Sequence, residues 1–506
     1  MSQKKTVARN AVWNWSGLAC SMIAGFIISP FLVGQLGEKT YALWILIASL
    51  TGYFGLLDLG TRSSVGRNVA FYRARDDQHN VNVMLSTSTA YLVLAGLVAV
   101  VATFALLFFI GRRFDVPADQ VDAARLAILL VGLSLACALT FNVFDAVLWG
   151  FQRFDLLNGI DIVTTVIRVA TTYTFLSEGY GITVLAMLTL LLTVFAGLAK
   201  GIACFWYEPR LRIAARFVTK EGARQIFSIG AWSFLLSVAR ILTTQMTMLL
   251  VVKRLSLELL TPYTIASRLV GYATSLVSSG TSVLTPFAAG LHAAGKTEQE
   301  RNLFYEGGKL CLAFTLFFTY NFLILGHALI LLWMKGKGNP AEAIPVLYVQ
   351  AIGETFSVAQ LVTVSLIFAK GKPRTLALIN MADGIVQVLC VIVLARPFGL
   401  IGVAIGIAMS ATFIRGFATF YWGARYVGAS IGRFMTRTFL PTLAITAIPA
   451  LILEGAVRLH SPRTWAELVL YGGGFTALYL VAGAALLGID RLREAGLMIS
   501  RRLGRI

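Results

Sequence analysis

Several cationic side chains lie inside long apolar stretches of this 506-residue chain, where a charge is costly. An arginine at mid-depth of a membrane span costs about 2.5–3.5 kcal/mol on insertion scales, so it normally faces a polar cavity or a partner. The guanidinium group also grips phosphate oxygens bidentately. We therefore expect a positive interior suited to a phosphate-bearing ligand. Its candidate residues are Arg168, Arg240, Arg268 and Arg415.

Carboxylates in the same stretches offer a structural alternative for each arginine. Asp161 and Arg168 lie seven residues apart, on one face of a helix. Asp145, Glu354 and Asp383 could pair with the other arginines. The sequence leaves open, for any one arginine, whether it lines a cavity or is held in an ion pair.

Acidic residues within spans are also candidates for gating or for coupling to an ion, because intramembrane carboxylates commonly relay protons or sodium. Asp161 belongs to this group, and Glu354 and Asp383 are the best coupling candidates. Asp58 and Arg62, four residues apart, could form a gate. A plain salt bridge at a helix end is the interpretation that we favour for that pair.

Other kinds of chemistry lack their usual signatures. The four histidines are scattered without metal-ligand spacing, the five cysteines include no CxxC pair, and G-x-S-x-G does not occur. The sequence therefore predicts no catalytic residue, metal or cofactor, and no enzyme activity.

One short string imitates a nucleotide-binding motif. Residues 290–297, GLHAAGKT, fit the P-loop pattern G-x-x-x-x-G-K-[ST]. That loop works between a strand and a helix with a second acidic site for magnesium. Here the string follows an apolar span and enters a short turn, so we interpret it as a chance match.

The elements that position these residues are membrane-spanning helices. Of the residues 57% are hydrophobic and only 13% are charged, and the apolar residues form blocks of about 20 or more, the length that crosses a bilayer. Only helices satisfy their own backbone in lipid over such runs. The predicted fold class is an all-α polytopic membrane protein with about 14 spans, although 12 would fit the same orientation. The predicted spans are 10–34, 41–60, 83–110, 122–149, 157–177, 181–206, 225–252, 258–287, 308–334, 342–369, 375–395, 400–423, 434–454 and 465–488.

The charge distribution predicts the orientation. Lysine and arginine exceed aspartate and glutamate by 43 to 24, which in a soluble chain would suggest nucleic acid. Here the cations gather between spans: with the N-terminus inside, cytoplasmic segments hold 26 and outer loops hold 10. This asymmetry favours a cytoplasmic (inner) membrane location with both termini in the cytoplasm, and no nucleic-acid partner.

An internal repeat organises the spans. The pairs Gly52-Tyr53 and Gly60-Thr61 recur as Gly271-Tyr272 and Gly280-Thr281, at an offset of about 220 residues. Six spans per repeat would make the two halves parallel. The predicted divisions are a six-helix N-terminal lobe (1–206), a basic cytoplasmic linker (207–224), a six-helix C-terminal lobe (225–424), and two additional helices with a basic tail (425–506).

Residues 34–75 resemble the first hairpin of polysaccharide flippases (O-antigen or exopolysaccharide, Wzx-like) in the multidrug/oligosaccharidyl-lipid/polysaccharide exporter superfamily. The resemblance rests on a short LGEKTY turn, an apolar span, GLLDLG and a run with arginines. RLSLELLTPYTIASRL resembles the matching hairpin of the second half. The span count and the 6+6+2 layout extend the likeness over the whole chain.

The resemblance implies a MATE-like transporter with two pseudo-symmetric lobes facing a central cavity. Its substrate would be a polyprenyl-pyrophosphate-linked oligosaccharide, flipped across the cytoplasmic membrane by alternating access, with polysaccharide polymerase or export machinery as candidate partners. Arg240 and Arg268 would act on one headgroup. Two alternatives remain: a membrane-embedded polymerase or ligase, which the short outer loops disfavour, and a drug or metabolite exporter. Residues 11–34 contain no acidic residue, unlike the first span of typical drug exporters.

Overall fold

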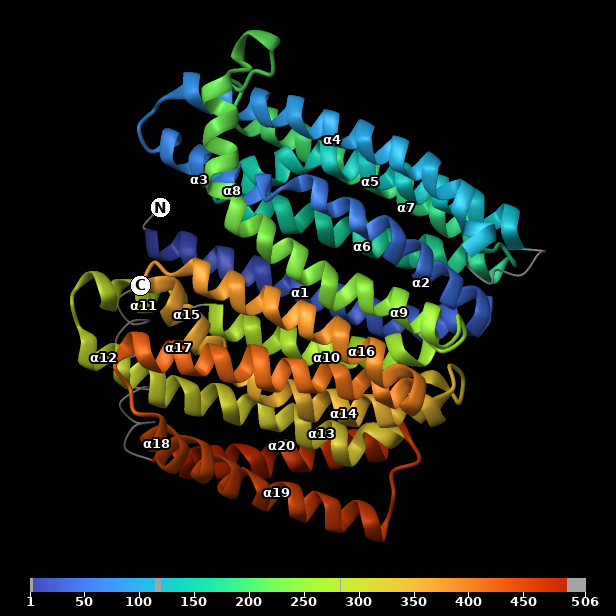
Figure 1. Ribbon diagram of the computed structural model, residues 1–506, viewed down its shortest axis with the longest axis vertical. Helices are drawn as coiled ribbons and strands as arrows, with labels where there is room; N and C mark the ends of the chain where they lie inside the picture. Colours follow the sequence, from blue (N-terminus) through green and yellow to red (C-terminus); the bar gives the residue numbers. More distant parts are fainter. Residues whose placement is uncertain (1–2, 114–119, 283, 489–506) are drawn as a thin grey trace. The chain divides into compact units, whose positions relative to one another are not determined.

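The computed structural model describes residues 3–113, 120–282 and 284–488, and within those ranges every regular element is helical. The chain divides into two compact units, 1–261 and 262–506. Figure 1 shows the helices of each unit running roughly alongside one another, as membrane spans do. The predicted fold class is confirmed. The basic tail beyond residue 488 lies outside the described residues, and the predicted lobe limits stay a prediction.

The helices of the first unit are joined mostly by short turns. Its elements are α1 (Gln3–Leu36), α2 (Glu38–Gly52), the 3₁₀ turn η1 (Tyr53–Asp58), α3 (Thr61–Arg73), α4 (Gln78–Arg113), α5 (Val121–Gly150), α6 (Phe154–Ser177), α7 (Ile182–Tyr207), η3 (Ala215–Phe217), α8 (Lys220–Ile241), the π turn η4 (Leu242–Met246) and α9 (Thr247–Arg254).

The second unit continues in the same manner from the first turn of α10. Its elements are α10 (Leu260–Ser282), α11 (Leu284–Ala293), α12 (Thr297–Asn302), η5 (Leu303–Gly307), α13 (Gly308–Met334), α14 (Pro340–Ala359), α15 (Leu361–Ala369), α16 (Pro373–Met409), the π turn η6 (Ser410–Gly416), α17 (Phe417–Val427), α18 (Ile431–Phe434), η7 (Met435–Phe439), α19 (Leu440–Leu459) and α20 (Trp465–Leu487).

The number of membrane passes agrees with the sequence. Eleven helical stretches among the described residues are long and apolar enough to span a bilayer. One of them, Pro373–Val427, holds two passes, because Gly399 (φ 60°) breaks α16. The helices α6 and α10 are also long enough to cross, although they are less apolar than the eleven. Together these make the fourteen predicted passes.

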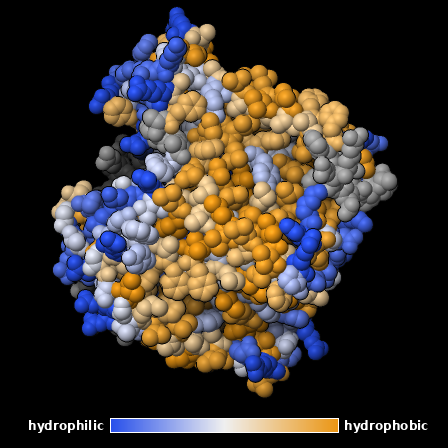
Figure 2. All heavy atoms as spheres, in the orientation of Figure 1, coloured by the Kyte–Doolittle hydropathy of each residue, from blue (hydrophilic) through white to orange (hydrophobic). Residues whose placement is uncertain are grey.

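Apolar side chains face outward along the middle of the helices. Exposed examples are Val101, Leu451 and Leu470, each with 69–74% of its surface accessible. On the face seen in Figure 2, hydrophobic residues cover the middle of the helices, and hydrophilic residues gather near their ends. In water such a surface would drive aggregation, whereas in a bilayer it faces lipid chains.

Two helix-ending turns recur at one spacing in the two halves of the chain. Asp76 and Gly295 each adopt a left-handed conformation after a helix, 219 residues apart. Gln152 and Gly371 do the same at the same offset. In all four turns the N–H of the next residue donates to the carbonyl five residues earlier, which is the Schellman arrangement. The two halves therefore repeat one backbone design, in agreement with the predicted pseudo-symmetry.

The second span is longer than the sequence predicted. The GLLDLG segment forms η1, and Leu59 (φ 46°) and Gly60 (φ 73°) break the helix there. The chain then continues as α3 for another thirteen residues. The apolar run of the sequence ends at residue 60 because α3, which follows it, is amphipathic. Its buried side packs on α4, α5 and α8 while its arginines stay exposed.

The segment between α7 and α8 is pinned to α4 by a line of polar side chains. The amide of Asn82 donates to the Arg210 carbonyl (3.3 Å) and accepts from the Arg212 N–H (3.0 Å). Ser86 donates to the Arg212 carbonyl, and Thr87 accepts from the backbone N–H at residue 219. These bonds satisfy extended backbone that has no strand to pair with. The linker is thus docked on the first unit, with its basic side chains exposed.

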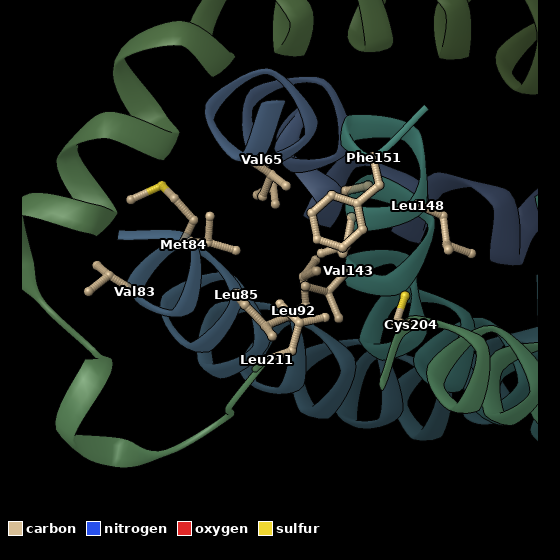
Figure 3. Close-up of a cluster of buried hydrophobic side chains, with 14 of the residues drawn as sticks. Val65, Val83, Met84, Leu85, Leu92, Val143, Leu148, Phe151, Cys204 and Leu211 are labelled. Carbon is tan, nitrogen blue, oxygen red and sulfur yellow. The ribbon is translucent and has the colours of Figure 1, made fainter. Parts of the chain in front are cut away.

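A hydrophobic core fixes this end of the first unit. Val65 of α3, Leu85 of α4 and Val143 of α5 meet there, each at most 1% exposed. Cys204 of α7 and Leu211 of the linker complete it (Figure 3). Burying such side chains contributes about 1.5–3 kcal/mol each. The linker is therefore held by apolar contacts as well as by hydrogen bonds.

In the second unit the last two spans pack on α13. Phe317 of α13 stacks on Phe475 of α20, with ring centroids 5.6 Å apart. The Tyr479 hydroxyl of α20 donates to the Ala313 carbonyl of α13 (2.7 Å). Leu453 of α19 belongs to the same buried cluster. The two additional helices are thus an integral part of this unit.

Candidate functional site

A charge cluster lies inside the first unit, where three helices meet. The Lys200 ammonium of α7 lies 2.7 Å from the Asp145 carboxylate of α5 and 2.8 Å from the Asp161 carboxylate of α6. The Lys200 and Asp145 side chains are 10% and 17% exposed, and Asp161 is 45% exposed. Lys200 was not among the predicted site residues. Its position inside an apolar stretch was the signal that could have identified it.

A second cluster lies inside the second unit. The Arg415 guanidinium, in the π turn η6, donates to the Glu354 carboxylate of α14 (2.6 Å). Its Nε lies 3.5 Å from the Asp383 carboxylate of α16. Asp383 is the most buried member, with 1% of its side chain exposed. Of the two alternatives that the sequence left open for Arg415, the structure shows the paired one.

The two clusters share a composition. Each joins two carboxylates on the fourth and fifth spans of its half to one cation on the sixth. Removing charges from water costs several kcal/mol per ion, which only close pairing offsets. The clusters therefore hold three helices together in each unit. With every group ionised, each would carry one uncompensated negative charge.

The other predicted arginines lie apart from these clusters. Arg168 is exposed on α6, and Arg240 is exposed in the last turn of α8. Arg268 is half-buried on α10, in the second unit. Asp161, which the sequence offered as the structural partner of Arg168, is paired with Lys200 instead.

The predicted ion pair at the end of the second span is absent from the described residues. Asp58 accepts hydrogen bonds from the Thr61 hydroxyl (2.5 Å) and from the Asn142 amide (3.4 Å). Arg62 is exposed on α3. The left-handed pair after η1 turns the chain between Asp58 and Arg62, so the two are not four residues apart on one helix. Asp58 thereby ties the broken second span to α5.

The P-loop-like string forms a helical corner. It begins in α11, turns at Gly295 (φ 66°) and enters α12 at Thr297. No strand precedes it within the described residues, and the glutamates in the first turn of α12 oppose an anion. Across the described ranges, no group of three or more His, Cys, Asp or Glu could hold a metal.

A large apolar cavity opens in the second unit between α10, α13 and α20. Its volume is about 680 Å³. Gly280 of α10, Phe314 of α13 and Gly483 of α20 line it, and Tyr479 and Thr476 are among its few polar side chains. Cavities of 300–1,000 Å³ hold small molecules, and an apolar lining selects an apolar one.

Comparison with known proteins agrees with this architecture. Residues 7–292 match the family model described as "Polysaccharide biosynthesis protein". A putative O-antigen transporter of Shigella flexneri is 21% identical over 407 residues, covering 79% of this chain and 94% of the relative. The uncharacterized membrane protein EpsK of Bacillus subtilis (strain 168) is also 21% identical, covering 78% and 79%.

Two solved structures share the fold. The lipid II flippase MurJ, in an inward closed conformation, gives a TM-score of 0.74 against this chain. The two are 13% identical, and the match covers 95% of this chain and 99% of MurJ. An inward-facing multidrug resistance MATE transporter of the MOP superfamily gives 0.69, with 15% identity, covering 83% and 98%. The Shigella flexneri relative and the two solved structures are named as transporters or a flippase, in agreement with the resemblance seen in the sequence.

Proposed function

Because the chain belongs to the polysaccharide biosynthesis protein family, a family of the MOP superfamily by its fold, we propose that it flips a polyprenyl-pyrophosphate-linked oligosaccharide across the cytoplasmic membrane. The substrate would move from the cytoplasmic to the outer leaflet by alternating access, with both termini in the cytoplasm. The family match, the transporter relative and the orientation of basic residues support this proposal. A polysaccharide polymerase or the export machinery would receive the product.

The observation that carries the proposal is the apolar cavity of the second unit. A polyprenyl chain is a long hydrocarbon, and the cavity offers about 680 Å³ lined mainly by aliphatic and aromatic side chains. Lipid tails are as apolar as these side chains, so the cavity contributes little net affinity. It would instead fix where the tail lies while the headgroup moves. The additional helix α20 forms one wall of the cavity, so the helices beyond the two six-helix lobes would take part in holding the substrate tail.

The pyrophosphate requires cations along its route. Crossing a low-dielectric region without them would cost several kcal/mol at least. Arg168 and Arg240 in the first unit and Arg268 in the second are the candidates. Arg415 is held by Glu354 at 2.6 Å. The gate roles considered for Asp58 and Arg62 and the coupling roles considered for Asp161 and Glu354 stay part of the proposal. Asp383 is not given a coupling role.

A deletion strain tests the function directly. Loss of the chain should leave lipid-linked oligosaccharide on the inner leaflet, and the wild-type gene should restore its transfer. Arg240→Ala and Arg268→Ala should each lower transfer without loss of membrane insertion, and lysine should rescue in part because it keeps the charge but not the bidentate fork. Arg125→Ala is the matched control, since Arg125 is 53% exposed beside Asp122. Full transfer by the double Ala variant would contradict the headgroup role.

The cavity is tested by filling it. A Cβ atom added at Gly280 or Gly483 meets no atom within 4 Å, and both glycines line the cavity, so leucine at either position should fold normally and project into the cavity. We expect Gly280→Leu and Gly483→Leu to lower transfer of long-tailed substrates. Gly455→Leu on α19, equally open but outside the cavity, should not. Normal transfer by a variant with both cavity substitutions would refute the tail-binding role.

A further inference from the structure

The second charge cluster contains a hydroxyl with too few hydrogens for its contacts. The Ser410 hydroxyl lies 2.7 Å from the Asp383 backbone carbonyl and 2.5 Å from the Asp383 Oδ1. A serine hydroxyl has one hydrogen, so it can donate fully to one of these oxygens. If Asp383 is ionised, the other short contact sets two lone pairs against each other. If Asp383 carries a proton on Oδ1, that proton is donated to Ser410, and both contacts are ordinary hydrogen bonds.

The charge balance of the cluster leads to the same assignment. Glu354 and Asp383 face a single cation, Arg415, which lies 2.6 Å from Glu354 but 3.5 Å from Asp383. The longer distance exceeds a normal N–H···O bond. Asp383 is 1% exposed, whereas Glu354 is 18% exposed. An ionised carboxylate so deeply buried, without a close cation, would cost several kcal/mol.

The other charged groups on the elements packed against α16 lie elsewhere: Arg425 of α17 is exposed over the Trp422 ring, and Glu342 is in the first turn of α14, more than three turns from Glu354. The helix α15 has no ionisable side chain, and the Tyr426 hydroxyl of α17 bonds Thr375 at the start of α16, more than two turns away. Among the described residues, Glu354 and Arg415 are thus the charged partners of Asp383.

The geometry points to Asp383 as a neutral, proton-bearing residue that positions Arg415. Ser410 is the first residue of the π turn η6, and Arg415 lies in the same turn. Such turns inside helices are uncommon and are often found at functional sites. By holding Ser410 through both its carbonyl and its carboxyl group, Asp383 fixes the start of the turn. The π turn η6 then directs the guanidinium of Arg415 to Glu354. Asp383 keeps its proton throughout the transport cycle.

Infrared spectroscopy of the full-length protein in lipid vesicles tests the protonation state. At pH 7 the wild type should show the C=O stretching band of a protonated carboxylic acid, and Asp383→Asn should lack it. Asp122→Asn, at a side chain that is 96% exposed, should leave the band unchanged. In Glu354→Gln the only carboxylate left to balance Arg415 is Asp383, so the band should also disappear. Identical spectra for wild type and Asp383→Asn at pH 7 would overturn the assignment.

Transport provides a second, independent readout, and this part of the test rests on the proposed function. Asparagine keeps the shape and can donate to Ser410, so Asp383→Asn should transfer substrate within about twofold of wild type. Asp383→Leu removes the side-chain donor to the Ser410 oxygen and leaves only the bond from Ser410 to the backbone carbonyl, so it should lose about tenfold or more. An inactive Asp383→Asn protein with normal insertion would mean that the proton must leave during transport, and the proposal would fail. If the wild type itself transfers no oligosaccharide, the proposed function fails while the infrared result still decides the protonation state.

Discussion

Removing the cation of the first cluster should destabilise the first unit. In Lys200→Met the side chain keeps its length and apolar stem but loses the ammonium group. Asp145, 17% exposed, then remains beside a second carboxylate without Lys200, the one cation that pairs with it among the described residues. The cost comes from the carboxylates left behind rather than from the lysine that is lost.

The structure sets the expected size of this effect. Breaking a buried ion pair by removing one partner costs about 3–5 kcal/mol. Asp161 is 45% exposed and can regain part of its hydration, so we expect the lower end, about 3 kcal/mol. On the scale of domains of 150–250 residues, where 1 kcal/mol shifts Tm by about 2–4 °C, this corresponds to a loss of about 6 °C or more.

The assay is thermal unfolding of the purified protein in detergent, followed by the loss of the monodisperse peak. Lys39→Met is the matched control, because Lys39 pairs with Glu258 at 3.2 Å while both side chains are more than half exposed. Such a pair contributes about 0–1 kcal/mol. Asp145→Asn adds a second comparison: it leaves one cation and one carboxylate, a balanced cluster. We expect that variant alone to be tolerated, and Lys200→Met to cost less in its background.

Two outcomes would refute the reasoning. If Lys200→Met and Lys39→Met lowered Tm equally, burial of the cluster would have no energetic consequence. If the effect of Lys200→Met were undiminished in the Asp145→Asn background, the unpaired carboxylates would not be its cause. Either result would remove the basis for treating these clusters as the ties between spans.

Three further predictions concern the ends of the helices. Cysteine labelling should place residues 207–224 and 296–301 in the cytoplasm and 335–340 outside; labelling of 296–301 from outside would overturn the topology. The protein should have no ATPase activity, and Lys296→Ala should leave transport unchanged. ATP binding by the wild type that Lys296→Ala abolishes would contradict this prediction. Asp77 accepts two hydrogen bonds from Asn80 at the start of α4, which hold the pKa of Asp77 below its usual value. The stabilisation is thus present above the unfolded-state pKa of Asp77 and is lost as pH falls through its folded-state pKa. Asp77→Ala should therefore lower the free energy of unfolding by about 1 kcal/mol at neutral pH and by less in acid. Thermal unfolding at both pH values checks this.

The sequence predicted features that depend on local periodicity and composition. The fourteen predicted blocks correspond to the eleven long apolar stretches of the described residues, the second pass within Pro373–Val427, and the less apolar helices α6 and α10, because a bilayer imposes one length on every span. The repeat was predicted from two pairs of residues, at which the halves differ: Gly60 is left-handed (φ 73°), whereas Gly280 lies inside α10. The repeat is seen instead in turns that recur 219 residues apart. The extension of the second span through α3 was missed. The helix α3 carries exposed arginines on one side, so its sequence lacks the apolar run that marks a span. Its helical continuation becomes clear only from the packing of its other side against α4, α5 and α8.

Ion-pair partners were the least predictable feature, and the reason is geometric. Asp161 and Arg168 share a helix face but lie about 10 Å apart along the axis, at 1.5 Å per residue. Lys200, 39 positions further along the chain, lies 2.8 Å from Asp161 because α6 packs against α7. In a bilayer an unpaired charge finds no water, so the nearest opposite charge on any adjacent span wins over a better-spaced one on the same helix. Because Asp161 pairs with Lys200, it does not neutralise Arg168, which is exposed on α6.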